Sequence, residues 1–219
     1  MATNILTETK KKLLTTLGNS EFIRKNFYLS GGTALVGFYI PYRYSEDLDF
    51  FSLEEIDVLS LSSFWKSKKK ELNIKGIDFQ QSFNRNLYFL QIDKETIKTE
   101  FTYYPFPRIE VGIKEFGLEI DNILDIAVNK LFTIYQQPRT RDYIDLYMIC
   151  KKYKYPILDL IAKSKIKFDW HIDPLQLGAQ FLKATEVKDY PRLIDKIPND
   201  VWQNFFIEEA KKLKGEILE

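Results

Sequence analysis

The pattern of hydrophobic residues changes at about position 121, and this change restricts the fold more than any other feature of the sequence. Apolar residues alternate with polar ones over residues 76–104, with turn-forming residues at Arg85-Asn86 and Asp93–Glu95. The strands that this alternation predicts are Ile77–Phe83, Leu87–Ile92 and Ile97–Tyr103. From Asp121 onward the apolar residues recur at helical spacing. The sequence therefore predicts an α+β first half with an antiparallel meander, and an all-helical second half.

The remaining segments follow the same two patterns. Short strands are expected at Phe27–Leu29 and around Asp47–Asp49. The expected helices are 2–17, Thr33–Tyr39, Ser60–Lys70, Ile123–Tyr135, Arg139–Tyr153, Ile157–Lys165, Pro174–Ala184 and Asn199–Leu218. We expect two regions, a mixed core over residues 1–115 and a helical region over 116–219 that packs on it.

Composition and single residues exclude several classes of protein. The 32 Lys and Arg nearly balance the 31 Asp and Glu, so there is no global attraction to nucleic acid. The only cysteine, Cys150, excludes an intramolecular disulfide, and the only histidine, His171, excludes any mechanism that needs two. Lys10–Lys12 precede no apolar run of the kind found in a signal peptide, and no segment suits a membrane helix. The expected compartment is the cytoplasm, without a membrane partner.

A Gly-Gly pair marks the first candidate site. Gly31 and Gly32 follow the expected strand Phe27–Leu29 and precede a helix. Adjacent glycines allow a ligand to approach the backbone, and a helix N-terminus offers unpaired N–H groups to an anion. The turn is therefore a candidate phosphate cradle, although a tight strand-to-helix turn without a ligand has the same sequence.

Acidic residues form the second candidate site. Asp47 and Asp49 are spaced to point to the same side of a strand, and Glu100 lies in a strand of the meander that we expect beside it. Aspartate is disfavoured within strands, and adjacent carboxylates repel unless a cation lies between them. Oxygen ligands suit Mg²⁺ or Mn²⁺. The alternative is that Asp47 and Asp49 are solvated at a strand end and that Glu100 simply points outward.

Two segments together resemble a known family. Gly31–Leu35 followed by Arg43–Phe51 is similar to the first signature of the polymerase-β-like nucleotidyltransferases, and in particular of the AbiEii/AbiGii-type toxins. Asn129–Leu131 followed by Arg139–Tyr147 resembles the second signature of that branch, a helical lysine and then an Arg-Asp-x-x-Asp-Leu run. The resemblance covers roughly Phe27–Cys150, a little over half of the chain.

The resemblance implies a fold and a reaction. The fold would be a nucleotidyltransferase core with a short mixed or antiparallel sheet, followed by the helical region. The reaction would move a nucleoside monophosphate from a nucleoside triphosphate (NTP) to an acceptor hydroxyl. Gly31, Gly32 and Thr33 would hold the triphosphate, and Asp47 and Asp49 would bind Mg²⁺ or Mn²⁺. The acceptor would be a tRNA or a protein, and an antitoxin would be the partner.

The resemblance also assigns roles to other residues. Glu100 would be the third metal ligand or a base, and Lys130 would contact the phosphates. Asp142 and Asp145 would orient Lys130 or the nucleotide; the alternative is an ordinary polar helix face paired with Arg139 or Arg141. Arg43 would either neutralise phosphate charge or brace Asp47.

Two other functions remain open on the sequence alone. A small-molecule nucleotidyltransferase of the antibiotic-modifying type would have the same core. A degenerate site would leave a module that only binds a nucleotide or a partner. The intact Gly31-Gly32 turn, Asp47 and Asp49 argue against the degenerate site.

Overall fold

The computed structural model describes the backbone of residues 5–217 and the side chains of residues 5–213, and these residues form two compact units. The first unit consists of the chain up to Pro41, Ser45–Pro107 and Val111–Asn122. The second unit consists of Tyr42–Tyr44, Arg108–Glu110 and the chain from Ile123. The change from strands to helices that the sequence shows at about position 121 coincides with the end of the first unit.

The first unit is built on a sheet. Within residues 5–217, seven strands form one mixed sheet in the order β3-β4-β5-β2-β1-β7-β6. The strands are β1 (Tyr28–Ser30), β2 (Leu48–Ser52), β3 (Ile74–Ser82), β4 (Arg85–Ile92), β5 (Glu95–Tyr103), β6 (Ile113–Glu115) and β7 (Leu118–Ile120). The expected antiparallel meander is β3-β4-β5, and β5 runs parallel to β2. The expected region boundary after residue 115 falls within the hairpin of β6 and β7, which belongs to the first unit.

The first turn of the meander differs from the sequence prediction. Ser82 pairs with Arg85, so the two-residue loop is Phe83-Asn84, and Arg85 and Asn86 lie within β4. Phe83 has a positive φ of 51°, the backbone conformation that tight hairpin loops use. The prediction of a turn at Arg85-Asn86 is therefore wrong, and the correction places Arg85 in the sheet.

Short helices complete the first unit. They are α1 (Glu8–Gly18), α2 (Glu21–Asn26), α3 (Gly31–Ala34), which continues into a π-helical turn (Leu35–Tyr39), and α4 (Val58–Lys68). The first expected helix included residues 2–4, which lie outside the described residues; α1 begins after Thr7, whose side chain accepts a hydrogen bond from the Lys10 amide. Helix α4 buries Leu61, Phe64 and Trp65 on one side, and its opposite side faces the solvent.

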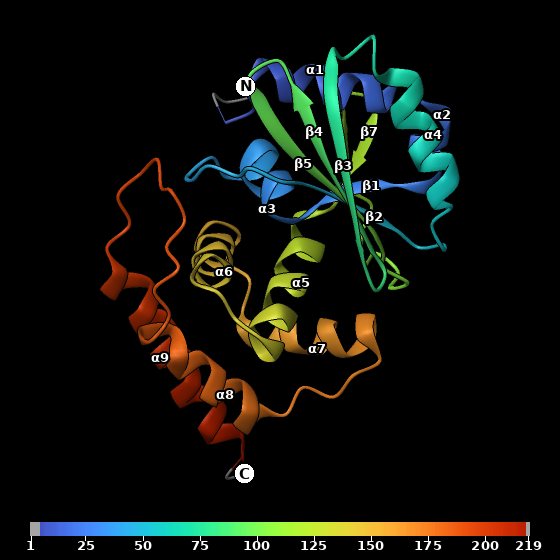
Figure 1. Cartoon of the computed structure of the whole chain (residues 1–219). Helices are drawn as coiled ribbons and strands as arrows, with labels where there is room; N and C mark the ends of the chain where they lie inside the picture. The colour runs from blue at the N-terminus through green and yellow to red at the C-terminus, as the bar shows by residue number, and fades with distance from the viewer. Residues whose placement is uncertain (1–4, 218–219) are drawn as a thin grey trace. The chain divides into compact units, whose positions relative to one another are not determined.

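The second unit is helical. Its helices are α5 (Ile123–Gln136), α6 (Thr140–Tyr153), α7 (Ile157–Phe168), α8 (Pro174–Leu182), a 3₁₀ turn (Lys183–Thr185) and α9 (Asn199–Ile217). Asp173 caps α8, Pro174 occupies its first turn, and α8 packs along α9 (Figure 1). The expected end of α9 at Leu218 lies outside the described residues. Cys150 is buried, which raises the pKa of its thiol to about 12 and makes it unreactive.

Among the described helices, none combines the length and the apolar character that a membrane span needs.

Candidate active site

The Gly-Gly turn lies directly against an acidic side chain. Strand β1 ends at Ser30, which pairs with Asp49 of β2, and α3 begins at Gly31. Gly31 has a positive φ of 70°, and a Cβ atom there would lie 2.4 Å from Oδ2 of Asp49. A side chain at this position would be strained and would collide with the carboxylate. Glycine is therefore required at residue 31 because Asp49 occupies the space that a side chain would need.

Thr33 connects the same turn to the acidic segment. Its side chain is buried, and its hydroxyl contacts the backbone oxygen of Asp47 and lies 2.9 Å from the Ser45 hydroxyl. A buried hydroxyl bonded in this way holds the chain just before β2 in place. The sequence led us to expect that the Thr33 hydroxyl contacts a triphosphate. In the structure this hydroxyl instead positions Asp47.

Adjacent strands bring the three acidic residues of the first unit to one region. Asp49 of β2 pairs with Glu100 of β5 in the parallel register, and Asp47 comes immediately before β2. The sequence prediction that Glu100 lies on a neighbouring strand is therefore confirmed. Glu100 is buried, whereas Asp47 and Asp49 are partly exposed. This gives one deep carboxylate beside two accessible ones.

Two cations pair with these carboxylates. Arg85 of β4 binds Glu100 with two hydrogen bonds, 2.5 Å from Nε to Oε1 and 2.7 Å from Nη2 to Oε2. Lys98 of β5 places its ammonium 2.9 Å from Oδ2 of Asp47 and 3.6 Å from Oε2 of Glu100. Burial would raise the pKa of Glu100, but the bonds and charge of Arg85, with the charge of Lys98, outweigh it and lower that pKa. Glu100 is therefore ionised at neutral pH.

The donor set of this region fits a divalent cation. Asp47 and Glu100 converge on one positive group, and the Asp49 carboxylate faces the glycine turn. Ionised oxygen ligands of this kind suit Mg²⁺ or Mn²⁺. In the part of the chain that the structure describes, no three His, Cys, Asp or Glu side chains are arranged as a ready metal cage. Here the pairing with Lys98 and Arg85 sets the carboxylate positions.

We expect Gly31→Ala to destabilise the protein and to displace Asp49. A left-handed backbone costs a residue with a side chain about 1–2 kcal/mol, and the added methyl group must also move the carboxylate. Urea unfolding measures the first effect and the rate of nucleotidyl transfer the second. Gly178→Ala in α8 is the matched control, because a Cβ atom added there would lie 4.0 Å from its nearest neighbour. This variant should stabilise the protein by about 0.5–1 kcal/mol. Equal stability of the two variants would contradict the expectation.

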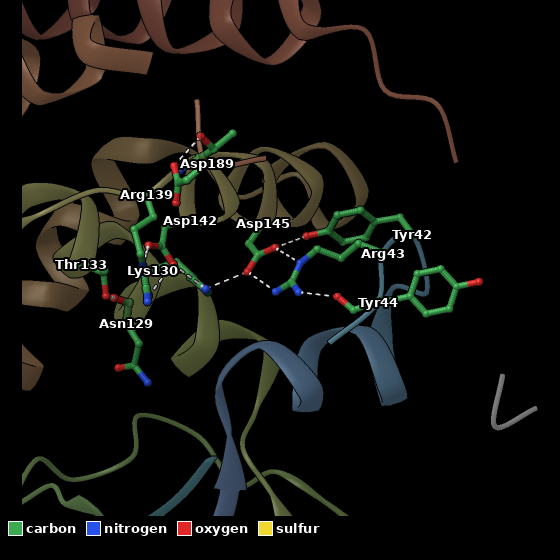
Figure 2. Close-up of polar contacts among 11 residues, drawn as sticks. Tyr42, Arg43, Tyr44, Asn129, Lys130, Thr133, Arg139, Asp142, Asp145 and Asp189 are labelled. Carbon is green, nitrogen blue, oxygen red and sulfur yellow. Dashed lines mark hydrogen bonds and ion pairs between the residues drawn. The ribbon is translucent and has the colours of Figure 1, made fainter. Parts of the chain in front are cut away.

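A second cluster of candidate residues lies within the helical unit (Figure 2). Lys130 of α5 contacts two aspartates of α6, with its ammonium 2.7 Å from Oδ1 of Asp142 and 2.7 Å from Oδ2 of Asp145. Arg139 binds Asp142 from the start of the same helix, with Nε 2.9 Å from Oδ2. Both aspartates are fully buried. They hold Lys130 in one position, as expected for residues that orient it, and they do not form a solvated polar face.

Arg43 belongs to this second cluster. Its guanidinium binds Asp145 through Nε and Nη2, at 2.7 and 2.8 Å, and its Nη1 binds the Tyr44 carbonyl (Figure 2). The carboxylate that Arg43 braces is therefore Asp145, where the sequence suggested Asp47. Burial would raise the pKa of Asp145, but the charges of Arg43 and Lys130 outweigh it and hold that pKa well below its usual range. Two cations thus share one buried anion.

Some residues of both clusters were missed in the sequence. The sequence prediction places Arg85 in a turn and assigns no role to Lys98, although both residues lie in strands. Tyr42, which donates its hydroxyl proton to Asp145, carried no pattern at all. For Arg85 and Lys98 the sequence holds a usable signal. Strand alternation puts Lys98 and Glu100 on one face of β5, and a turn two residues earlier puts Arg85 in β4, opposite Thr102.

Comparisons with known proteins identify the fold and the family. The structure resembles that of JHP933 from Helicobacter pylori, with a TM-score of 0.63 and 24% sequence identity. The match covers 95% of this chain and 90% of the JHP933 chain. A second Helicobacter pylori structure, provisionally assigned as a nucleotidyltransferase, matches with a TM-score of 0.62 and 26% identity over 97% of this chain and 95% of that one. An uncharacterized protein of Aquifex aeolicus (strain VF5) is 30% identical over 148 residues, 67% of this chain and 68% of the relative.

The fold is the polymerase-β-like nucleotidyltransferase fold that the sequence indicated, with a mixed sheet and a helical C-terminal region. The family model described as "Nucleotidyl transferase AbiEii toxin, Type IV TA system" matches residues 12–212. This match includes both clusters and extends beyond the segments that carried the resemblance in the sequence. The chain is therefore a nucleotidyltransferase and belongs to the AbiEii family of toxins of type IV toxin–antitoxin systems.

Proposed function

We propose that this enzyme transfers a nucleoside monophosphate from an NTP to an acceptor hydroxyl with the help of Mg²⁺ or Mn²⁺ bound by Asp47, Asp49 and Glu100. The observation that carries the proposal is the contact of the Asp49 carboxylate with the Gly31 turn, beside Glu100 on the neighbouring strand. Anionic ligands and backbone N–H groups are then close together, as a metal-bound triphosphate requires.

The roles of the first unit follow from its contacts. The N–H groups of the turn at Gly31 and Gly32 would donate hydrogen bonds to the phosphates, and Thr33 would keep Asp47 in position. Bound at the carboxylates, the metal would neutralise the phosphate charge and help pyrophosphate to leave. Positioning and charge neutralisation supply most of the acceleration in phosphoryl transfer.

The helical unit contributes a fixed positive charge in this proposal. Lys130 is the residue that we assign to the phosphates, and Asp142 and Asp145 hold its ammonium at 2.7 Å each. The same aspartates engage Arg139 and Arg43, so those two residues act by supporting the carboxylates. An ammonium with two carboxylate partners is held in one place, which suits the recognition of an anion.

The family supports our proposal for the acceptor and the partner. Membership of a toxin family favours a macromolecular acceptor, a tRNA or a protein, and an antitoxin as the partner. Incubation of the full chain with Mg²⁺ and each of the four labelled NTPs, with total RNA, a protein extract or a small-molecule panel, tests this. Label on RNA or protein supports the proposal, and label on a small molecule supports the antibiotic-modifying alternative. Mg²⁺-dependent NTP binding without any transfer would identify a module that only binds.

A further inference from the structure

Lys98 lies where the proposed function requires a metal, and its contacts differ in kind from those of Arg85. Its ammonium has one close partner, Asp47, and a looser one, Glu100, at 2.9 and 3.6 Å. Arg85 instead holds Glu100 through two parallel hydrogen bonds. A bidentate guanidinium–carboxylate pair is the stronger arrangement, because two bonds fix its orientation. Of the two cations, Lys98 is the more easily displaced.

The surroundings of Lys98 also allow it to move. Its side chain is 24% exposed and Asp47 is 30% exposed, whereas Glu100 is 9% exposed. An ion pair that reaches solvent contributes little and can be exchanged, since water replaces what each partner loses. A flexible lysine stem lets the ammonium change partners without any change in the backbone.

The charges explain why the ammonium occupies this position. Asp47, Asp49 and Glu100 bring three carboxylates to the start of β2 and the adjacent part of β5, and all three interact electrostatically with Arg85. One arginine cannot neutralise three anions, and carboxylates this close repel one another without a cation between them. Lys98 supplies that second positive charge when no metal is bound.

We propose that Lys98 is an internal counter-ion that competes with the divalent metal, so that metal binds well only when a nucleotide is present to take over the ammonium. The inference rests on the proposed function, because it assumes the metal assignment made there. Metal bound to Asp47 and Glu100 would displace the ammonium, which then has the triphosphate as its nearest anionic partner. Lys98 thus couples the binding of metal to the binding of NTP.

The test is the affinity for Mn²⁺, measured by titration calorimetry on the full chain with no nucleotide. Lys98→Met keeps most of the length of the side chain and removes its charge, so we expect Mn²⁺ to bind about tenfold more tightly than in the wild type. Lys98→Arg keeps the charge and should bind like the wild type. Lys75→Met, at an exposed lysine of β3, is the matched control and should also bind like the wild type.

A second arm uses a non-hydrolysable NTP analogue. With the analogue bound, the advantage of Lys98→Met should vanish or reverse, because the wild-type ammonium then contributes to phosphate binding. A purely structural role for Lys98 would not make the Mn²⁺ affinity depend on the nucleotide in this way. Lys98→Gln, tested in parallel, gives the same comparison if the Met variant does not fold, and circular dichroism checks each variant.

The outcomes separate the two proposals. Unchanged or weaker Mn²⁺ binding in both charge-removing variants would overturn the role of Lys98 and leave the proposed function intact. If Asp47→Asn and Asp49→Asn bind Mn²⁺ as tightly as the wild type, the metal assignment itself fails, and the role of Lys98 fails with it.

Discussion

Asp49→Asn should lower the rate of nucleotidyl transfer by about a hundredfold or more and leave the melting temperature almost unchanged. Asparagine has the shape of aspartate but not its charge, so the space beside Gly31 stays filled while the affinity for metal falls. Asp49 is only partly buried, and its backbone pairing with Ser30 and Glu100 does not depend on its charge. The measurement is pyrophosphate release in the presence of the acceptor that the labelling experiment identifies.

Asp78→Asn is the matched control for this prediction. Asp78 is an exposed residue of β3, so the same chemical change there should alter neither the rate nor the melting temperature. A rate for Asp49→Asn within a few-fold of the control would contradict the metal assignment. A large loss of stability would instead show that the carboxylate supports the fold.

The parts of the site that the sequence predicted are those set by local pattern. The position of Gly31 and Gly32 at a strand-to-helix junction could be predicted, because turn signals depend on only a few consecutive residues. The meander could be predicted from alternation, and with it the position of Glu100 on a strand beside Asp49. In both cases the residues that determine the structure are close in sequence or belong to one repeating pattern.

What the sequence could not predict depends on long-range pairing. Arg43 binds a carboxylate 102 residues away, and no local feature distinguishes Asp145 from Asp47 as its partner. An error of two residues in the position of a turn assigned Arg85 to a loop, although the sheet register pairs this residue with Thr102 and brings it to Glu100. A turn shifted by two residues leaves each side chain on the same face of the sheet but changes which residues lie opposite one another, and so which charges meet.

Asp145→Asn should destabilise the protein by about 3–5 kcal/mol, the largest stability change that we expect from a single substitution in it. The buried carboxylate of Asp145 binds the guanidinium of Arg43 and the ammonium of Lys130, and it accepts a hydrogen bond from Tyr42. Removing its charge leaves Arg43 buried without a counter-ion, while Lys130 keeps only Asp142. Urea unfolding at pH 7 measures the loss, and Asp159→Asn at an exposed position of α7 should change stability by less than about 0.5 kcal/mol.

The pH dependence of the same variant tests the cause. The cations lower the pKa of Asp145 in the folded protein, so its stabilising effect is complete above the unfolded pKa, about 3.9, and declines as the pH falls toward the folded value. The difference in unfolding free energy between wild type and Asp145→Asn should therefore be constant from pH 7 to about pH 5 and shrink below about pH 4. A difference that stays the same at low pH would mean that the lost stability comes from packing or hydrogen bonding, and that the buried charge contributes little to it.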